Sequence, residues 1–336
     1  MIEKLRVALV IHPDLVPGVL NLNISEAERR SVPWITEWDV MNALTRLGHK
    51  VLVYAVHSKS CLLKIVKDRE NFDLVFNLLE QVGEEPSEDY ILPKILEKNK
   101  IPYTGCNWKE LRLGKDKLET KKKVKSIGVS VAENINLGCP VFPLILKFNE
   151  EDGSYGIFKA NIIHNKEALR KRINFLKNKY GGDLFAEEFL KGKEVYVSIS
   201  KNNCSELDIP HARELCFLKS KNPDLEIYTE KAKWSYKYQK SKNIFTRKLG
   251  DDILNRRVIE EAKRIYNGLQ LTGPVRIDFR CNNTGIYFLE LNPNPNLAFD
   301  DDFFLSRGST LNSYDMMISS LVQMAFYRYE NYFEVA

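Results

Sequence analysis

Long apolar runs are missing from this sequence. No stretch reaches about 18 consecutive apolar residues, the length that a membrane-spanning helix needs. The chain begins with a strand-like segment and lacks the apolar region and small-residue cleavage site of a secretory signal peptide. We therefore expect a cytoplasmic protein that has no membrane among its partners.

Motifs that identify several common enzyme classes are also missing. The six cysteines form no C-x-x-C pair and no metal-ligand spacing, so we expect reduced thiols. No G-x-G-x-x-G follows the first expected strand, which argues against a dinucleotide-dependent dehydrogenase. Nor is there an arrangement of Ser, His and Asp, or of Cys and His, for nucleophilic catalysis. The net charge of +5 suits a small anionic ligand and does not require nucleic acid.

The first hundred residues alternate between expected strands and helices. β-Branched and apolar segments predict strands at 5–12, 50–56 and 72–79. A helical pattern follows the first strand, with Thr36 as its N-cap and Gly48 just beyond its end. This βαβαβ order predicts an α/β domain with a parallel, open sheet.

The rest of the chain predicts an α+β arrangement. Before it, residues 87–99 form an expected helix with Ser87 as its cap, and Pro93 must bend this helix or mark a later start. A Lys-rich helix at 114–128 then opens a section that we expect to be a small sheet with two helices. Further strands are expected at 142–148, 158–163, 183–190, 193–200, 273–280 and 285–292, and further helices at about 166–179, 252–269 and 312–329.

The last two expected strands carry polar side chains that suit a metal ion. Glu290 and Asn292 are two residues apart on one strand and share a face, while Leu289 and Leu291 share the other face. Asp278 lies on the other strand of the expected hairpin. Oxygen ligands of this kind suit Mg²⁺ and leave room for phosphate oxygens. The alternative is that Asp278 and Glu290 pair with Arg276 and Arg280 at the sheet edge.

Two other segments suit a nucleotide. Lys147 ends an apolar strand and precedes a loop that contains Gly and Ser, whose backbone N–H groups can hold phosphates. The segment 185–197, "FAEEFLKGKEVYV", places carboxylates where they can bind an adenine amino group and a ribose hydroxyl. The alternatives are an ordinary hairpin loop for the first segment and a salt-bridged surface turn for the second.

The order of several short segments resembles that of the ATP-grasp ligases, and within them the D-alanine–D-alanine ligase family. These segments are "IPYTG", "KDKLETK", "FPLILK", "GSYGI", "EEFLKGKE", "RIDFR" and "LELNPNP". The resemblance implies an N-terminal α/β domain at about 1–108 and a two-lobed ATP-grasp fold. Its central lobe (109–198) and C-terminal lobe (199–336) would hold ATP between two sheets.

The resemblance also implies a role for each matching residue. Lys117 and Lys147 would bind the ATP phosphates, although Lys117 is alternatively part of a solvated helix face. Ser154 would close a lid loop over the phosphates, and Arg276 would stabilise a tetrahedral oxyanion. Glu187 and the Leu190 backbone would contact the adenine, and Glu194 would bind the ribose. The implied ligands of the metal ion, Mg²⁺ or Mn²⁺, are Asp278, Glu290 and Asn292.

The reaction implied by the resemblance joins a small-molecule carboxylate to an amine. ATP phosphorylates the carboxylate, the amine attacks the acyl phosphate, and phosphate leaves; no nucleophilic side chain is needed. Two alternatives stay open: a ligase that acts on a peptide or a secondary metabolite, and a nucleotide-binding protein without ligase activity. The family resemblance leaves a homodimer open as well.

The sequence departs from the family pattern at both substrate positions. Glu80 and Gln81 stand where the family has His-Gly, and Glu26, Glu28 and Glu37 are loose candidates for the acidic residue that holds the first substrate's ammonium. Downstream, Trp234 follows Lys233 where the family has Tyr after Lys.

An acidic run stands where the family usually has Ser-Leu to bind the second substrate's carboxylate. The run consists of Asp300, Asp301 and Asp302. Because three carboxylates would repel a substrate carboxylate and attract a cation, we expect an acceptor other than D-alanine, such as a basic amino acid, a polyamine or a carboxyl-blocked amine. The alternative is that the run is a solvated loop or caps the last helix.

Overall fold

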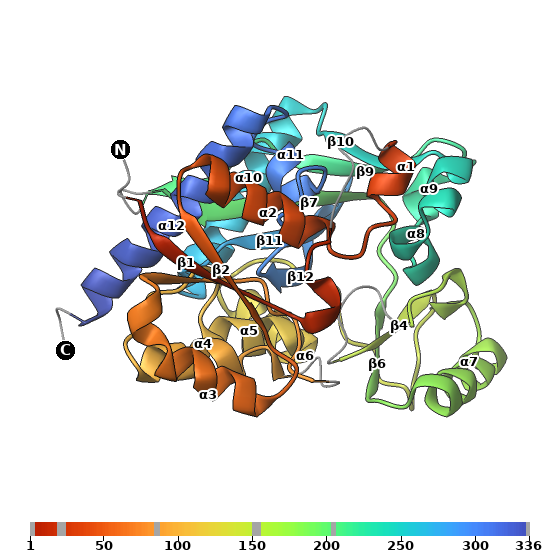
Figure 1. The fold of residues 1–336 in the computed structure, drawn as a ribbon. Coiled ribbons are helices and arrows are strands. Elements are labelled where there is room, and N and C mark those ends of the chain that lie inside the picture. The colour runs from red at the N-terminus through yellow and green to blue at the C-terminus, as the bar shows by residue number, and fades with distance from the viewer. Residues whose placement is uncertain (1–3, 19–24, 84–87, 150–155, 203–205, 334–336) are drawn as a thin grey trace.

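A three-stranded parallel sheet forms the N-terminal part of the molecule (Figure 1). A computed structural model describes residues 4–18, 25–83, 88–149, 156–202 and 206–333. The strands β1 (Arg6–Ile11), β2 (Lys50–Ala55) and β3 (Leu74–Asn77) lie in the order β2–β1–β3, which confirms the predicted parallel sheet.

Helices cover both faces of this sheet. They are α2 (Ile35–Arg46), α3 (Lys59–Lys67), α4 (Ile91–Lys98) and, from the other end of the chain, α12 (Leu311–Phe333). Tyr314, Ile318 and Leu321 of α12 are buried in one cluster with Val7 and Leu9 of β1. The N-terminal domain, expected at about 1–108, therefore shares part of its core with residues near the C-terminal end of the chain.

The predicted start of α2 is wrong. The helix begins at Ile35 after Trp34, and the Thr36 hydroxyl donates instead to Oδ1 of Asn296 at 2.9 Å. Gly48 has φ +87° just beyond the helix end, as predicted. Pro93 lies in the first turn of α4, where a missing N–H costs nothing, so the later start applies; Ser87 lies outside the described residues.

A six-stranded sheet forms the largest part of the molecule. Its strands β7 (Lys193–Lys201), β9 (Arg213–Phe217), β10 (Ile244–Lys248), β11 (Val275–Asn282) and β12 (Gly285–Pro293) run in the order β10–β9–β7–β11–β12, and β8 (Leu207–Asp208) pairs with β7. The β11–β12 hairpin is the predicted one. Side chains of α5 (Trp108–Lys115), α6 (Lys117–Ser126) and α10 (Asp252–Gly268) pack against one face.

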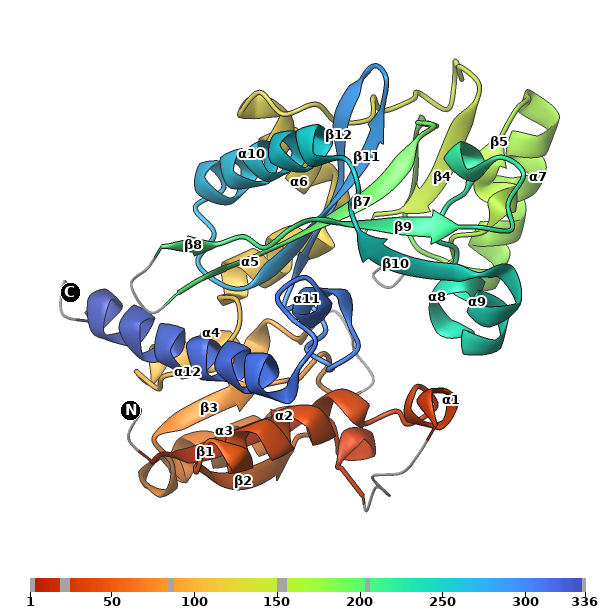
Figure 2. The ribbon, with the colours of Figure 1, turned by 90° about the horizontal axis from the view of Figure 1, so that it is seen from above.

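A smaller antiparallel sheet lies beside the large one (Figure 2). It has the order β5–β4–β6, built from β5 (Ile162–Ile163), β4 (Leu144–Phe148) and β6 (Leu184–Glu188), and α7 (Lys166–Tyr180) packs on it. The strand expected at 158–163 is shorter than predicted because Lys159–Asn161 form a 3₁₀ turn.

The segment between β6 and β7 joins the two sheets. We expected these strands in one small sheet, but β6 pairs with β4 while β7 pairs with β11 and β9. The expected lobe boundary at 198/199 therefore falls inside β7, and the chain changes sheet at 189–192. This crossing requires glycine at position 192 (φ +130°), because a Cβ there would lie 2.2 Å from the carbonyl oxygen of Cys281.

Short helices connect these elements. They are the 3₁₀ helices Pro13–Leu15, Arg69–Asn71 and Pro223–Leu225, and α1 (Glu26–Arg29), α8 (Glu230–Trp234), α9 (Tyr236–Lys242) and α11 (Asp302–Leu305). A helix of the length and apolarity that would cross a bilayer does not occur in the described part of the chain.

Gly273 sets a testable limit on the packing at the start of β11. A Cβ at this position would lie 2.5 Å from Cα and 2.6 Å from Sγ of Cys106. We expect Gly273→Ala to lower the free energy of unfolding by about 1–3 kcal/mol, as overpacking does. Gly250→Ala, where the added Cβ meets open space, should change it by less than about 0.5 kcal/mol. Equal denaturation midpoints for both variants would contradict this account.

Candidate active site

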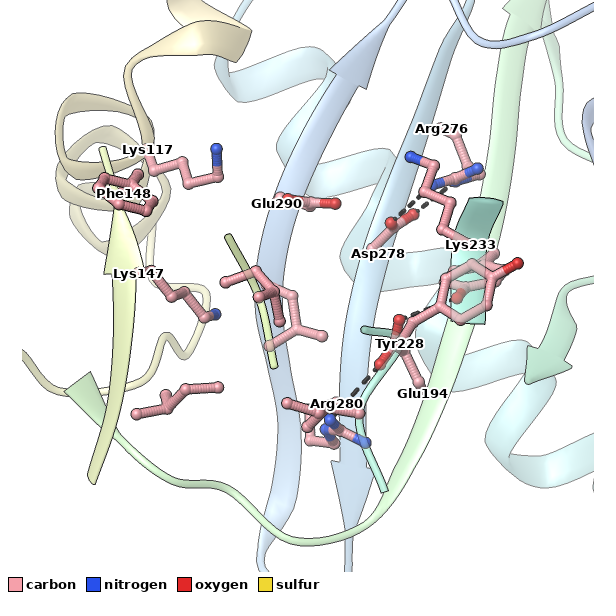
Figure 3. Close-up of a pocket in the computed structure, with 15 residues that line it drawn as sticks. Lys117, Lys147, Phe148, Glu194, Tyr228, Lys233, Arg276, Asp278, Arg280 and Glu290 are labelled. Atoms are coloured by element: carbon pink, nitrogen blue, oxygen red, sulfur yellow. Dashed lines mark hydrogen bonds and ion pairs between the residues drawn. The ribbon is translucent and has the colours of Figure 1, made fainter. Parts of the chain in front are cut away.

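The candidate active site is a cavity between the small and the large sheet (Figure 3). One wall comes from β4 and the start of α6, and the other from β7, β11 and β12. Its apolar and aromatic lining consists of Ile145, Phe148, Ile157, Tyr196, Ile227, Tyr228 and Leu289. A cavity with such walls can enclose a flat ring as well as charged groups.

Basic side chains outnumber carboxylates in this cavity. The lining includes five cations, Lys117, Lys147, Lys233, Arg276 and Arg280, and three carboxylates, Glu194, Asp278 and Glu290. In Figure 3, Lys117 and Lys147 extend from one wall toward Glu290, and Arg276, Lys233 and Arg280 lie on the other side. This excess of positive charge suits a ligand with several negative charges.

The face of β11 that lines the cavity follows from strand alternation. Ile277 and Phe279 point into the core under the helices, so Arg276, Asp278 and Arg280 face the cavity. On β12 the alternation is broken by a β-bulge. Asp278 of β11 lies opposite Glu290, but the next residue, Phe279, lies opposite Phe288.

The bulge changes the predicted faces of β12. Glu290 pairs with Asp278 across the strands, and Leu291 is buried in the core as expected. Leu289, however, lines the cavity with Glu290 instead of sharing the face of Leu291. The expected simple alternation of Leu289 and Glu290 is therefore wrong at this point of the strand.

The three expected metal ligands are only partly together. Asp278 and Glu290 both line the cavity on neighbouring strands, whereas Asn292 lies opposite Arg276 and donates to its carbonyl oxygen at 3.5 Å. The described residues contain no cluster of three His, Cys, Asp or Glu side chains suited to a metal. Two facing carboxylates still provide the hard oxygen donors that Mg²⁺ or Mn²⁺ requires, with ligand oxygens completing the set.

Asp278 also pairs with Arg276, which is the alternative that the sequence left open. Nε and Nη2 of Arg276 donate to the two carboxylate oxygens of Asp278 at 2.8 and 2.9 Å. Burial nevertheless raises the pKa of Asp278 to about 7. Glu290 behaves differently: burial opposes its ionisation, but Lys117, Lys233 and other nearby cations hold the pKa below its ordinary value. The site therefore favours negative charge at Glu290 more than at Asp278.

Arg280 does not pair with Glu290. Its Nη2 lies 3.4 Å from Glu194, and its Nη1 donates to the carbonyl oxygens of Gly192 and Glu226 at 2.9 and 3.1 Å. Glu194 also accepts a hydrogen bond from the Tyr196 hydroxyl at 2.8 Å. These contacts fix Glu194 at the cavity wall.

Glu187 is close to the cavity but does not line it. Its side chain is buried, and its two carboxylate oxygens contact Nζ of Lys147 and Nζ of Lys121. Lys147 does line the cavity, and burial lowers its pKa to about 8. Leu190 is half-buried in the segment that joins the two sheets, and Ser154 lies outside the described residues.

Sequence reasoning missed some lining residues. Arg280 has the same parity as Arg276 and Asp278, so the two-residue period of a strand could have placed it in the site. Lys233 belongs to a segment that we noted only as a departure from the family pattern. Tyr228 precedes a short helix and carries no local signal for a site.

The acidic run is largely compensated within the chain. Nε of Arg213 donates to Asp302 at 2.8 Å, and Asp300 lies 3.5 Å from Nε of Arg30. Asp301 caps α11 by accepting from the backbone N–H of Phe303 at 3.3 Å. Because Asp300 and Asp302 are already paired with arginines, they are less able than Asp301 to repel a substrate carboxylate or to attract a cation.

A second cavity lies between the N-terminal sheet and the loop after β12. It is lined by Thr36 and Glu37, the segment 77–80, Thr104 and Gly105, Pro274, the segment 294–297 and Leu321. Glu37 is 5% exposed and its Oε2 has no hydrogen-bond partner; the same holds for Nδ2 of Asn77, also 5% exposed. Burial, with a smaller effect from Glu80, raises the pKa of Glu37 to about 7.

Of the three loose acidic candidates, Glu37 is the one that lines this cavity. Glu28 accepts hydrogen bonds from the backbone and hydroxyl of Ser25 and is exposed, and the side chain of Glu26 lies outside the described residues. None of the described lining residues of this cavity carries a positive charge. A ligand with a cationic donor would satisfy the free carboxylate oxygen of Glu37.

Comparisons with known proteins agree with this arrangement. A family model described as "D-ala D-ala ligase C-terminus" matches residues 105–323. An uncharacterized protein, y4sG, from Sinorhizobium fredii is 26% identical over an alignment 344 residues long, which covers 97% of this chain and 98% of that protein. A D-alanine–D-alanine ligase from Aquifex aeolicus is 28% identical over 286 residues, covering 81% of this chain and 88% of the relative.

A solved structure has the same fold. The D-alanine–D-alanine ligase from Bacillus anthracis complexed with ATP superposes with a TM-score of 0.71 over 98% of this chain and 100% of that chain, at 16% identity. This likeness confirms the expected architecture, an N-terminal parallel sheet followed by a two-lobed ATP-grasp fold.

The buried carboxyl of Glu37 should reduce the stability of the ligand-free protein above neutral pH. Its pKa is about 7 in the folded protein and near 4.5 when unfolded, so folding is progressively weakened as the pH rises between these values. We expect Glu37→Gln to raise the free energy of unfolding at pH 8, by at most about 3 kcal/mol, and to change it little at pH 4.

Chemical denaturation at the two pH values measures this difference. Glu167→Gln, on the exposed face of α7, is the matched control and should change stability at neither pH. A Glu37→Gln variant that is less stable than the wild type at pH 8 would contradict the assignment of an uncompensated carboxyl.

Proposed function

Because the chain belongs to the D-alanine–D-alanine ligase family of ATP-dependent ligases, we propose that it joins a small carboxylic acid to an amine through an acyl phosphate. ATP would phosphorylate the carboxylate, and the amine would displace phosphate through a tetrahedral intermediate. The observation that carries the proposal is the cavity in which Lys117 and Lys147 face Asp278 and Glu290 from the opposite wall.

The proposed nucleotide contacts use both walls. Lys117 and Lys147 would bind the phosphates, because they are the cations on the wall formed by β4 and the start of α6, and both point toward Glu290. Glu194 would accept from the ribose, since its side chain is held at the cavity wall by Tyr196. We retain Glu187 and the Leu190 backbone as the adenine contacts and Ser154 as the lid residue.

We propose that Asp278, Glu290 and Asn292 hold Mg²⁺ or Mn²⁺. When bound, the ion would neutralise charge between the phosphate oxygens during phosphoryl transfer. Asp278 would then share its carboxylate between the ion and Arg276. Arg276 remains at the same wall, where its guanidinium can stabilise the oxyanion of the tetrahedral intermediate.

The second cavity is the proposed site of the carboxylic acid substrate. The loop 294–297 that lines it continues directly from β12, so the cavity is adjacent to the proposed metal site. Glu37 would accept hydrogen bonds from an ammonium group, and Asn77 Nδ2 would donate to an oxygen of the same substrate. We therefore propose an amino acid as the donor, with a small side chain against Leu78, Leu297 and Leu321.

We retain an acceptor other than D-alanine as part of the proposal. The residue that supports it is Asp301, because Asp300 and Asp302 are paired with arginines. Burial and the adjacent Asp302 raise the pKa of Asp301 to about 6, and Arg276 opposes this effect. A carboxylate that interacts with Arg276 in this way would compete with an acceptor carboxylate for the same cation.

Amine-dependent release of ADP tests the proposed function. We expect ADP release only when an amino acid donor and an amine are both present, and the highest rates with acceptors that lack a free carboxylate or carry an additional cation. Highest activity with D-alanine as acceptor would refute the acceptor proposal. ATP binding without any acceleration by amines would instead support a nucleotide-binding protein without ligase activity.

Glu290→Gln should reduce this activity by at least the roughly 10–100-fold that changes around bound metals typically cost. The substitution removes the negative charge that would bind the metal ion and that interacts with Lys117 and Lys233. Steady-state ADP release over a range of Mg²⁺ concentrations measures the effect. Glu260→Gln, which breaks an exposed ion pair with Lys263, is the control. Wild-type rates for Glu290→Gln at limiting Mg²⁺ would exclude it as a metal ligand.

A further inference from the structure

One buried carboxylate beside the nucleotide cavity is shared by two lysines. Oε1 of Glu187 contacts Nζ of Lys147, and Oε2 contacts Nζ of Lys121. Glu187 is 1% exposed and Lys121 is 3% exposed. A charge buried this deeply requires a partner, because removing one member of a buried pair leaves the other uncompensated.

The two lysines differ in their access to the cavity. Lys147 comes from β4 and lines the cavity together with Lys117 and Glu290. Lys121 comes from α6, does not line the cavity, and lies over the ring of Phe185 at 5.7 Å. A ligand in the cavity can therefore contact Lys147 directly but not Lys121.

An anionic ligand would change the partners of these groups. Lys147 also interacts electrostatically with Glu290, Lys117 and Arg280, so its ammonium is subject to charges of both signs. Phosphate oxygens placed near Lys147 would compete with Glu187 for this ammonium. If Lys147 moved to the phosphates, Lys121 would be the remaining cation in contact with Glu187 among the described residues.

We propose that Lys121 is a positioning residue that keeps Glu187 compensated while Lys147 exchanges Glu187 for the phosphates of the nucleotide. The proposal rests on the nucleotide site assigned above and adds to it a residue that touches neither nucleotide nor substrate. Without Lys121, Lys147 would be the sole partner of a buried carboxylate and would be retained by it.

Calorimetric titration with Mg²⁺ and a non-hydrolysable ATP analogue tests this exchange. Lys121→Gln should raise the dissociation constant at least about tenfold, the size expected for one lost charge-assisted hydrogen bond. Lys125→Gln is the matched control: it lies one turn further along α6 and breaks an exposed ion pair with Glu133 at 2.7 Å. The control should bind the analogue as the wild type does.

A double variant separates this role from a purely structural one. Magnesium tripolyphosphate has no adenine, so it reports the phosphate contact alone. Lys121→Gln should weaken its binding, and Lys121→Gln combined with Glu187→Gln should restore it, because a neutral residue 187 no longer retains Lys147. If Lys121→Gln does not fold, the double variant and Lys121→Arg, which keeps the charge, should both bind tripolyphosphate like the wild type.

Two results would overturn the proposal. One is wild-type affinity for the ATP analogue in Lys121→Gln, and the other is a double variant that binds tripolyphosphate no more tightly than the single variant. Failure of the wild-type protein to bind the ATP analogue would be a different outcome, since it refutes the nucleotide site itself.

Discussion

Two carboxylates, Asp278 and Glu290, face each other across the β11–β12 hairpin, and the rest of the proposed site depends on this pairing. Their cross-strand pairing places both at one wall of a cavity whose opposite wall carries Lys117 and Lys147. A shift of one residue in this register would turn the charged face of β11 into the core. The bulge beside Asp278 adjusts the alternation so that Glu290 and Leu289 both reach the cavity.

Within the site, the charged side chains compensate one another. Arg276 holds Asp278, Arg280 lies beside Glu194, and Lys147 contacts Glu187. A metal-bound triphosphate brings both signs of charge, so its binding can exchange these pairs for new ones without leaving a buried charge alone. Glu37 in the second cavity differs, because its free oxygen has no partner until a ligand supplies one.

Local patterns in the sequence predicted most of the strands, the hairpin and the face of Glu290, because each depends on the two-residue period of a strand. The strands β8, β9 and β10 were not among those predicted. Local patterns could not predict that β6 and β7 belong to different sheets, since both strands have the same local pattern. The pairing of Asp302 with Arg213 was equally hidden, because it joins segments 89 residues apart. Similarly, only the fold shows that Glu37, and not Glu28, lines a cavity.

A crystal structure with Mg²⁺ and a non-hydrolysable ATP analogue would test the central claim most directly. We expect a metal ion bound by carboxylate oxygens of Asp278 and Glu290 and by phosphate oxygens of the analogue. A nucleotide bound elsewhere, or bound in this cavity with both carboxylates turned away from its phosphates, would contradict this claim.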